Sequence, residues 1–381
     1  MNFTYNDEQR QLAESIGRFV DRQYDFATRQ RIVASSEGWS REVWAELAQL
    51  GVLALPLPSE CGGYDGRALH LVPFMHAVGS ALMVEPYVAT IGLPARLLAR
   101  GGTPAQRTTI LPDVAAGRLT MAFAHGERNA RYDLAHVETR VRKCDRGYRI
   151  DGDKRVVLGA PGADLLLVSA RHSGEVHDRT GIGVFIIQPG APGVSMRAYR
   201  TIDELRAADI RFDNVIVSDE ARIGAEGSAL PLIEDCVDYA TALTCAEAVG
   251  ALGYANDATL EYVKTRRQFG VAIGSFQALQ HRLVDMFIAG EQATSMAFLA
   301  CAAVDDEPDA MLRKRAVSAA KIRIADACRH ISQEAIQLHG GMGMSDELKI
   351  SHTFRRLTMI AQQFGDADHH LERFATCDLE P

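Results

Sequence analysis

The stretch 240–250 constrains the fold of this chain more than any other. It reads Ala-Thr-Ala-Leu-Thr-Cys-Ala-Glu-Ala-Val-Gly, so it can pack on every side, which is typical of a helix at the centre of a bundle. The one ionisable residue in it is Glu247, and acidic side chains are rarely fully buried without a partner. The helical pattern stops near Gly270 and Gly274 and then resumes. The apolar face of the second helix is expected to carry Phe276, Leu279, Leu283 and Met286.

Length and composition restrict the class of protein. A chain of 381 residues exceeds the usual size of one domain, so two or three structural units are expected. An apolar fraction of 47% and a charged fraction of 24% are those of an ordinary globular protein. The net charge of −8, with no compensating basic run, argues against nucleic-acid binding.

The sequence shows no sign of export or of a membrane span. The first residues, 1–5, contain neither a basic nor an apolar region of a signal peptide, and no continuous apolar run is long enough to cross a bilayer. The seven cysteines are odd in number, scattered and without a C-x-x-C motif. We therefore expect reduced, buried thiols in a cytoplasmic protein that binds no membrane.

The periodicity of the chain changes twice. The first third is helical, with a capping box at Asn6 and Gln9 and a helix that ends at Gly51. Between about 120 and 212, short alternating or β-branched runs separated by Gly- and Asp-containing turns predict an all-β insert; one of these runs is 136–143. The chain then becomes helical again. The predicted units are a helical domain over 1–118, a β domain over 119–225 and a helical bundle over 226–381.

Two motifs in the last unit carry a resemblance. The first is Arg266-Arg-Gln-Phe-Gly270 followed by Phe276-Gln277, and the second is Gln337-Leu-His-Gly-Gly-Met-Gly343. Together, and in this order, they resemble the Arg-x-x-Phe-Gly…Phe-Gln and Gln-x-x-Gly-Gly-x-Gly motifs of the acyl-CoA dehydrogenase family. The resemblance runs from about Phe3 to Phe374. It implies an α+β fold, mostly α: an N-terminal helical domain, a small central β-barrel and a C-terminal four-helix bundle.

The resemblance also implies FAD as the cofactor, because protein side chains offer no good hydride acceptor. In the family the flavin ring lies on the β-barrel of one subunit, and the motifs of a neighbouring subunit hold the pyrophosphate and adenine. An arginine suits phosphate, and glycines allow close backbone approach. The FAD-binding residues implied here are Arg266, Phe269, Gln277, Gln337, Gly340 and Gly341. The alternative is that Arg266 is a surface arginine and that the glycines only end a helix.

The part that contacts the flavin ring departs from the family pattern. Members carry a Thr-Glu-Pro segment where this chain has His125-Gly-Glu127, and Lys-x-Trp-Ile-Thr-Asn where it has residues 154–159. Val156 therefore replaces the aromatic residue that packs on the flavin. Leu158 replaces the hydroxyl residue that bonds a ring nitrogen.

The positions of the family's catalytic base are also altered. One usual position is occupied by Phe364 and the other by Ala240. Glu247 lies one heptad after Ala240, and an apolar pocket raises the pKa of a carboxylate, as suits a general base. Glu247 is therefore the candidate base; its alternatives are an ion pair with an arginine across the bundle, or exposure to solvent. Asp366 and Asp368 are more simply explained as the solvated start of a helix. The adjacent His369 and His370 do not indicate a metal site, because neighbouring side chains on a helix diverge.

These departures resemble the small subunits of two-gene acyl-CoA dehydrogenases, which act on bulky or unusual acids such as sterol side chains or dicarboxylates. We expect an oxidoreductase that forms the 2,3-enoyl thioester from an acyl-CoA in β-oxidation, with electron-transfer flavoprotein as the electron acceptor. The partner is a second family subunit in an α2β2 tetramer, or another copy of the chain. Two other hypotheses are a non-catalytic subunit that completes the FAD site of its partner, and a different flavoenzyme, an oxidase or monooxygenase, on this fold.

Overall fold

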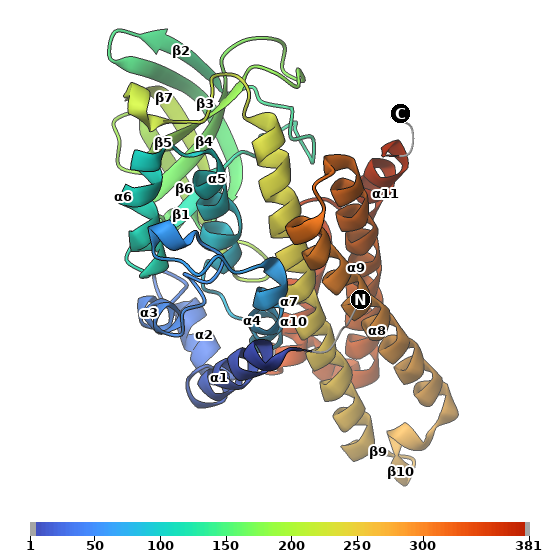
Figure 1. Ribbon diagram of the computed structural model, residues 1–381. Coiled ribbons are helices and arrows are strands. Elements are labelled where there is room, and N and C mark those ends of the chain that lie inside the picture. Colours follow the sequence, from blue (N-terminus) through green and yellow to red (C-terminus); the bar gives the residue numbers. More distant parts are fainter. Residues whose placement is uncertain (1–4, 378–381) are drawn as a thin grey trace. The chain divides into compact units, whose positions relative to one another are not determined.

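The computed structural model describes residues 5–377, which divide into two compact units (Figure 1). One unit combines residues 5–31, 68–83 and 241–377, and the other combines 32–67 and 84–240. The dividing point at 240/241 lies inside the longest helix, α7 (Leu230–Thr265). The mostly helical α+β fold expected from the sequence is confirmed.

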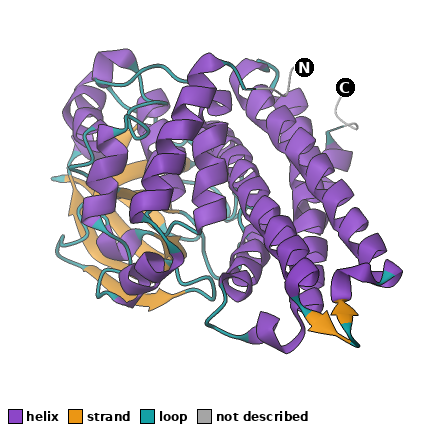
Figure 2. Cartoon of the chain, turned by 90° about the horizontal axis from the view of Figure 1, so that it is seen from below, coloured by secondary structure: helices purple, strands orange, loops and turns teal. Residues whose placement is uncertain are grey.

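The helices of the first third of the chain have 17 residues or fewer, whereas three later helices are long: α7 has 36 residues, and α8 and α9 have 30 each (Figure 2). The early helices are α1 (Asp7–Gln23), α2 (Phe26–Ala34), α3 (Arg41–Gln49), α4 (Ala68–Ala81), the π-helix η2 (Val88–Ala95), α5 (Arg96–Gly101) and α6 (Pro104–Ala115). The later ones are α7, α8 (Gln277–Asp306), α9 (Ala310–His339), α10 (Lys349–Gln362) and α11 (Ala367–Thr376). Short 3-10 turns are η1 (Ser59–Cys61), η3 (Ala160–Gly162), η4 (Asp219–Ala221), η5 (Ile273–Ser275) and η6 (Gly340–Met344). The capping box at Asn6 and Gln9 is present at the start of α1.

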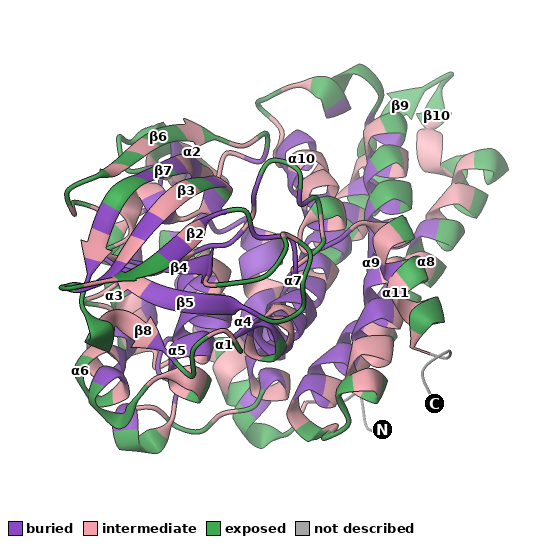
Figure 3. Cartoon of the chain, turned by 90° about the horizontal axis from the view of Figure 1, so that it is seen from above, coloured by how far each residue is buried: buried purple, intermediate pink, exposed green. Residues whose placement is uncertain are grey.

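The apolar stretch of α7 is buried on every side, as expected. Every residue from Ala240 to Ala248 is at most 3% exposed (Figure 3). Two glycines allow α4 and α7 to cross closely: a Cβ on Gly79 would lie 1.9 Å from the carbonyl oxygen of Glu247, and one on Gly250 would lie 1.9 Å from that of His76. The backbones therefore approach to a distance that any larger residue would prevent.

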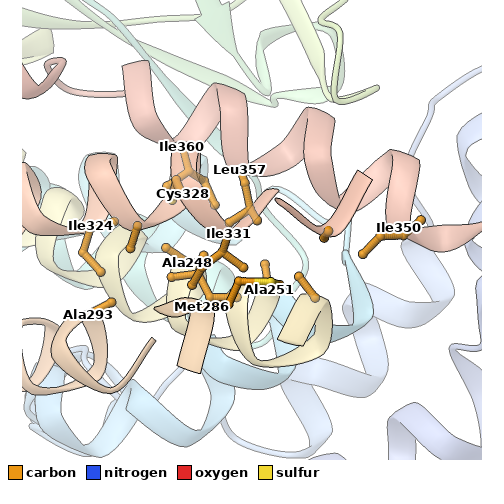
Figure 4. Packing of buried hydrophobic residues seen from close by; sticks show 14 of the residues in the cluster. Ala248, Ala251, Met286, Ala293, Ile324, Cys328, Ile331, Ile350, Leu357 and Ile360 are labelled. Atoms are coloured by element: carbon orange, nitrogen blue, oxygen red, sulfur yellow. The ribbon is translucent and has the colours of Figure 1, made fainter. Parts of the chain in front are cut away.

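The core of the bundle is built from α7, α8, α9 and α10 (Figure 4). Ala248 and Ala251 of α7 pack with Met286 of α8 and with Ile331 of α9. The apolar residues of α9, spaced alternately by three and four positions, are buried along the length of the helix: Val317, Ala320, Ile324, Cys328, Ile331, Ala335 and Leu338 are all 5% exposed or less. On α8, Met286 is buried, but Phe276 is 39% exposed, so the predicted face is only partly internal.

The β domain is one eight-stranded sheet with the order β6-β7-β3-β2-β4-β5-β8, and β1 pairs with β4 in parallel. Its strands are β1 (Met121–Ala124), β2 (Arg140–Cys144), β3 (Gly147–Leu158), β4 (Leu165–Arg171), β5 (Ile182–Ile187), β6 (Val194–Arg200), β7 (Arg206–Val217) and β8 (Arg222–Ile223). Alternate residues of these strands, such as Ile150, Val168 and Ile210, form its apolar core.

Three details differ from the sequence prediction. β6 was not expected, although Val194, Met196 and Ala198 alternate along it with Ser195, Arg197 and Tyr199. The run 136–139 is a loop, and only 140–144 forms a strand. The α8 helix contains an 18-residue window of mean hydropathy 1.4, so by length and composition it is apolar enough to cross a membrane, although 44% of that window is buried inside the fold.

Candidate functional site

The segments that carry the two sequence motifs lie at the same end of the helical bundle. Arg266 follows the last residue of α7, Gln277 is the first residue of α8, and Gln337 lies in the last turn of α9. The rings of Tyr262 and His339 stack with their centroids 4.4 Å apart, which holds the end of α7 against the end of α9. Helix packing therefore brings the two motifs together.

A β-hairpin with a two-residue turn connects α7 to α8. β9 (Arg267–Gln268) pairs antiparallel with β10 (Val271–Ala272). The turn residues Phe269 and Gly270 both have positive φ, +54° and +81°, as the favoured type of tight hairpin turn requires. The Phe269 side chain is 89% exposed at the tip and contacts Phe276 edge to face.

The motif side chains of Arg266, Gln277 and Gln337 are exposed to solvent. Within residues 5–377, no hydrogen bond or ion pair engages the side chains of Arg266, Gln277 or Gln337. Gly340 adopts φ +60° and ψ −141°, a conformation that is essentially restricted to glycine, and Gly341 has open space where a side chain would be. These groups are free to contact a ligand.

The first turn of α8 adds hydrogen-bond donors to the same region. Its N-cap residue, Phe276, provides no side-chain acceptor for the first N–H groups of the helix. The start of a long helix attracts anions, because unsatisfied N–H groups and the helix dipole point at the ligand. An exposed arginine, bare glycines and this helix start form a donor set suited to a pyrophosphate.

Glu247 is buried deeper in the same unit, where it forms a two-point ion pair with Arg356 of α10. Its Oε1 accepts a hydrogen bond from Nε of Arg356 at 2.6 Å, and its Oε2 accepts one from Nη2 at 2.8 Å. Only 3% of Glu247 and 7% of Arg356 are exposed. The expectation that this carboxylate stands alone in an apolar pocket is therefore wrong. The alternative named above, pairing with an arginine across the bundle, is the arrangement observed.

A second buried polar cluster lies inside the β domain. The Nζ of Lys154 donates to Oε1 of Glu127 at 2.7 Å, to Oγ of Ser169 at 2.9 Å and to the carbonyl of His125 at 3.1 Å. Burial lowers the pKa of the Lys154 ammonium. For Glu127, burial acts to raise the pKa, but the nearby ammonium of Lys154 and the hydrogen bonds that the carboxylate accepts outweigh it, so the pKa of Glu127 is lowered. We take the pair as ionised, because three acceptors surround Nζ. The cluster ties the segment after β1 to β3.

The two altered flavin-contact positions lie on β3. Val156 is 54% exposed and has a φ of +51°, in the left-handed region that β-branched residues normally avoid. Leu158 is half-buried at the end of the strand. Within the described β domain, these two positions offer neither an aromatic ring nor a hydroxyl group.

Comparison with known sequences assigns most of the chain to one family. Profiles of the acyl-CoA dehydrogenase N-terminal, middle and C-terminal domains match residues 6–118, 122–215 and 230–376. The chain belongs to the acyl-CoA dehydrogenase family. Members are oxidoreductases that act on CH–CH groups, and FAD is the cofactor.

Three individual proteins are similar to the chain over nine tenths of its length or more. An L-prolyl-[peptidyl-carrier protein] dehydrogenase of Serratia sp. is 29% identical, with 91% of this chain and 90% of the relative covered. Among solved structures, an FAD complex of PigA superposes with a TM-score of 0.91 at 26% identity, covering 99% of this chain and 98% of the other. The ChsE4–ChsE5 complex from Mycobacterium tuberculosis superposes with a TM-score of 0.89 at 25% identity, with both chains fully covered.

The fit of this acyl-CoA dehydrogenase chain to FAD is uneven. The donor set of Arg266, Gln277, Gln337 and the two glycines suits the pyrophosphate end of FAD. When bound, FAD supplies the hydride acceptor that side chains lack. The ring-contact positions on β3 do not match the family pattern, because Val156 and Leu158 can neither stack on the flavin as an aromatic does nor donate a hydrogen bond from a side chain.

The structure also accounts for the other acidic and histidine candidates. Asp366 is the N-cap of α11 and accepts from the N–H of His369, so it is the helix start predicted for it. Both ring nitrogens of His370 have partners within the chain, Ser318 and the carbonyl of Phe364. Arg356 was not singled out from the sequence as the partner of Glu247. Its only signal is the Arg355-Arg356 pair, which does not show which arginine points inward.

One group of residues has the spacing of a metal site. Single ligand atoms of Glu127, His136 and Glu138 lie within 4.8 Å of one another. The carboxylate of Glu127, however, already accepts from Lys154 and from the backbone N–H groups of Glu138 and Thr139. The geometry is explained by these internal bonds, and we assign no metal to it.

Proposed function

We propose that this chain is a subunit of a heteromeric acyl-CoA dehydrogenase that forms the 2,3-enoyl thioester of a bulky or unusual acid in β-oxidation. In this proposal the chain contributes the pyrophosphate-binding half of an FAD site to a second family chain in an α2β2 assembly. Electron-transfer flavoprotein is the proposed electron acceptor. The observation that carries the proposal is the contrast between the free donor set around Arg266 and the altered positions at Val156 and Leu158.

The exposed apolar surface of the hairpin and α8 supports a partner chain. Its large apolar residues are at least 39% exposed, which is unusual for neighbouring side chains on a monomer. They are Phe269, Val271, Phe276, Val284, Phe287 and Ile288. Because this surface adjoins Arg266 and Gln277, a chain that covers it would lie beside the donor set. A heteromeric relative structure, the ChsE4–ChsE5 complex, is consistent with a partner from the same family.

The proton-abstracting base is proposed to lie on the partner chain. Phe364 and Ala240 occupy the usual base positions here, and both oxygens of Glu247 accept from Arg356. A carboxylate in this pair would first have to break two charge-assisted hydrogen bonds before taking a proton. The alternative is the role of base that the sequence predicts for Glu247, which stays untested and which Glu247→Gln in the assembled enzyme tests.

The deciding experiment is to express the chain alone and together with a family member encoded next to it. We expect colourless protein alone and one FAD per two chains after co-expression, measured from the visible spectrum and protein concentration. A yellow protein with one FAD per chain from the single gene contradicts the heteromer. In that case Glu247→Gln in the homomeric enzyme becomes the test of the base.

A second candidate is dehydrogenation or oxidation of a thioester on a carrier protein. The similarity to an L-prolyl-[peptidyl-carrier protein] dehydrogenase over 91% of this chain favours it. Turnover of a carrier-bound aminoacyl thioester, but not of an acyl-CoA, would select this candidate. Oxygen consumption coupled to that turnover would identify an oxidase.

A further inference from the structure

One open depression lies on the outer face of the β6-β7-β3 part of the sheet, and it is lined by charged residues from all three strands. Its volume is about 280 Å³. Cross-strand pairing explains the cluster: Ser195 and Asp153 lie on either side of Arg211, and Arg197 lies opposite Asp209. Side chains of one face recur at every second residue of a strand, so these groups share one surface.

The carboxylate of Asp209 accepts hydrogen bonds from two of the arginines that line the depression. It accepts from Nη1 of Arg155 at 2.9 Å, from Nη2 of Arg197 at 3.0 Å, from the hydroxyl of Tyr199 at 3.1 Å and from the backbone N–H of Val156 at 3.2 Å. One carboxylate therefore positions two guanidinium groups at the edge of the depression. Each guanidinium retains further N–H donors, since an arginine has five.

Arg211 supplies a third guanidinium, which forms no ion pair within the described part of the chain. Its side chain is exposed, and within residues 5–377 no hydrogen bond or ion pair engages it. Three arginines and two aspartates line the depression, so it carries one net positive charge. Ser195 adds a hydroxyl donor, and Met196 and Ile210 provide an apolar base. The donors come from several directions around one space.

The backbone beside the depression is distorted. The pairing of β3 with β7 shifts between Lys154 and Val157, which indicates a β-bulge. Val156, inside the bulge, has the positive φ described above, and its N–H is held by Asp209. Bulges and strained residues are frequent next to ligand sites, where they redirect side chains. Here the bulge places Arg155 on the rim.

We propose that this depression is a binding site for a phosphate group, formed by Arg155, Arg197, Arg211 and Ser195. A tetrahedral oxyanion accepts hydrogen bonds in several directions, which matches separate guanidinium groups and a hydroxyl better than a planar carboxylate does. The phosphate is either a free ion or the 3′-phosphate of CoA. The site goes beyond the proposed function and does not depend on FAD or on a partner chain.

The test is calorimetric titration of the purified full chain with inorganic phosphate at constant ionic strength. Arg211→Gln and Arg197→Gln are each expected to weaken binding by about tenfold or more, as for loss of a hydrogen bond to a charged group. The matched control is Arg146→Gln, an exposed arginine in the β2–β3 turn of the same domain with no ion pair in the described chain. It should leave binding unchanged. No saturable binding, or equal weakening by all three variants, overturns the proposal.

Competition then identifies the source of the phosphate. Displacement of phosphate by CoA, but not by 3′-dephospho-CoA, assigns the site to the 3′-phosphate of CoA. Binding of phosphate that CoA does not displace assigns it to the free ion. In both cases Arg211→Gln must also weaken phosphate binding. Neither measurement uses flavin absorbance, so failure of the heteromer proposal leaves this test unaffected.

Discussion

Glu247 and Arg356, 109 positions apart in the chain, form a buried bidentate ion pair between α7 and α10. Each of them would be costly to bury alone, because a charge removed from water needs a partner. The pair therefore connects two helices that also share the apolar core of the bundle and a contact of the Lys349 ammonium with the Tyr254 ring. It also explains why the stretch 240–250 of α7, whose other side chains are small or apolar, contains a carboxylate.

Removing one member of this pair should destabilise the fold strongly. Glu247→Leu leaves the Arg356 guanidinium buried without its carboxylate, and we expect a loss of roughly 3–5 kcal/mol in the free energy of unfolding. Urea unfolding of the purified chain measures it. The double variant Glu247→Leu/Arg356→Met should recover most of the loss, because both charges are gone. Equal stability of the wild type and the single variant would contradict a structural role.

The crossing of α4 and α7 should tolerate no side chain at its two glycines. Gly79→Ala and Gly250→Ala each place a Cβ 1.9 Å from a backbone oxygen, so the helices must separate. We expect each to lower the midpoint of urea unfolding clearly. Gly253→Ala, in the same helix with open space around it, is the matched control and should be neutral or slightly stabilising. A similar response of all three variants would refute the close crossing as the cause.

Loss of the Arg266 guanidinium should weaken FAD binding in the assembled enzyme. Arg266→Gln removes the positive charge of the proposed pyrophosphate site, and we expect roughly a tenfold or greater rise in the dissociation constant of FAD. Flavin fluorescence during dilution of the co-expressed complex measures it. Arg267→Gln is the control, because Arg267 is exposed, comes next in the sequence and donates from its side chain to the carbonyl of Gly270. If both variants lose FAD equally, general charge rather than a specific contact is responsible.

Acid should selectively abolish the contribution of Asp209 to stability. Burial acts to raise the pKa of Asp209, but the N–H of Val156, the two arginines and Tyr199 outweigh it and lower the pKa to about 2. Because the folded-state pKa lies below the unfolded value of about 3.9, this contribution is complete above that value and is lost as the pH falls towards 2. The wild type should therefore exceed Asp209→Asn in free energy of unfolding at pH 6, by a margin that shrinks between pH 4 and pH 2.

The control for this acid effect is Asp145→Asn. Asp145 is exposed in the β2–β3 turn, and the described chain shows no ion pair for it. The stability difference between the wild type and this variant should not change over the same pH range. A margin for Asp209→Asn that is constant with pH would show that the carboxylate is not the stabilising group.

Local sequence patterns determined the helices and their buried faces. The stripe from Val317 to Leu338 and the capping box at Asn6 need only the periodicity of a helix and the chemistry of its first turn. The two motifs around Arg266 and Gln337 likewise identified the family, because they are contiguous in the chain. Strand β6 was missed, although Val194, Met196 and Ala198 alternate with Ser195, Arg197 and Tyr199; its Val194 and Met196 are only partly buried against the core of the sheet.

Only the tertiary structure decided how the charged residues are used. The sequence placed Glu247 on a buried helix, but the choice between a free base and an ion pair depended on α10 bringing Arg356 within 2.6 Å. In the same way, Asp209 acquires its role from residues on the two strands that flank its own, β3 and β6. The role of a carboxylate depends on the groups that packing places around it. Periodicity along the chain carries no information on partners that are far away in sequence.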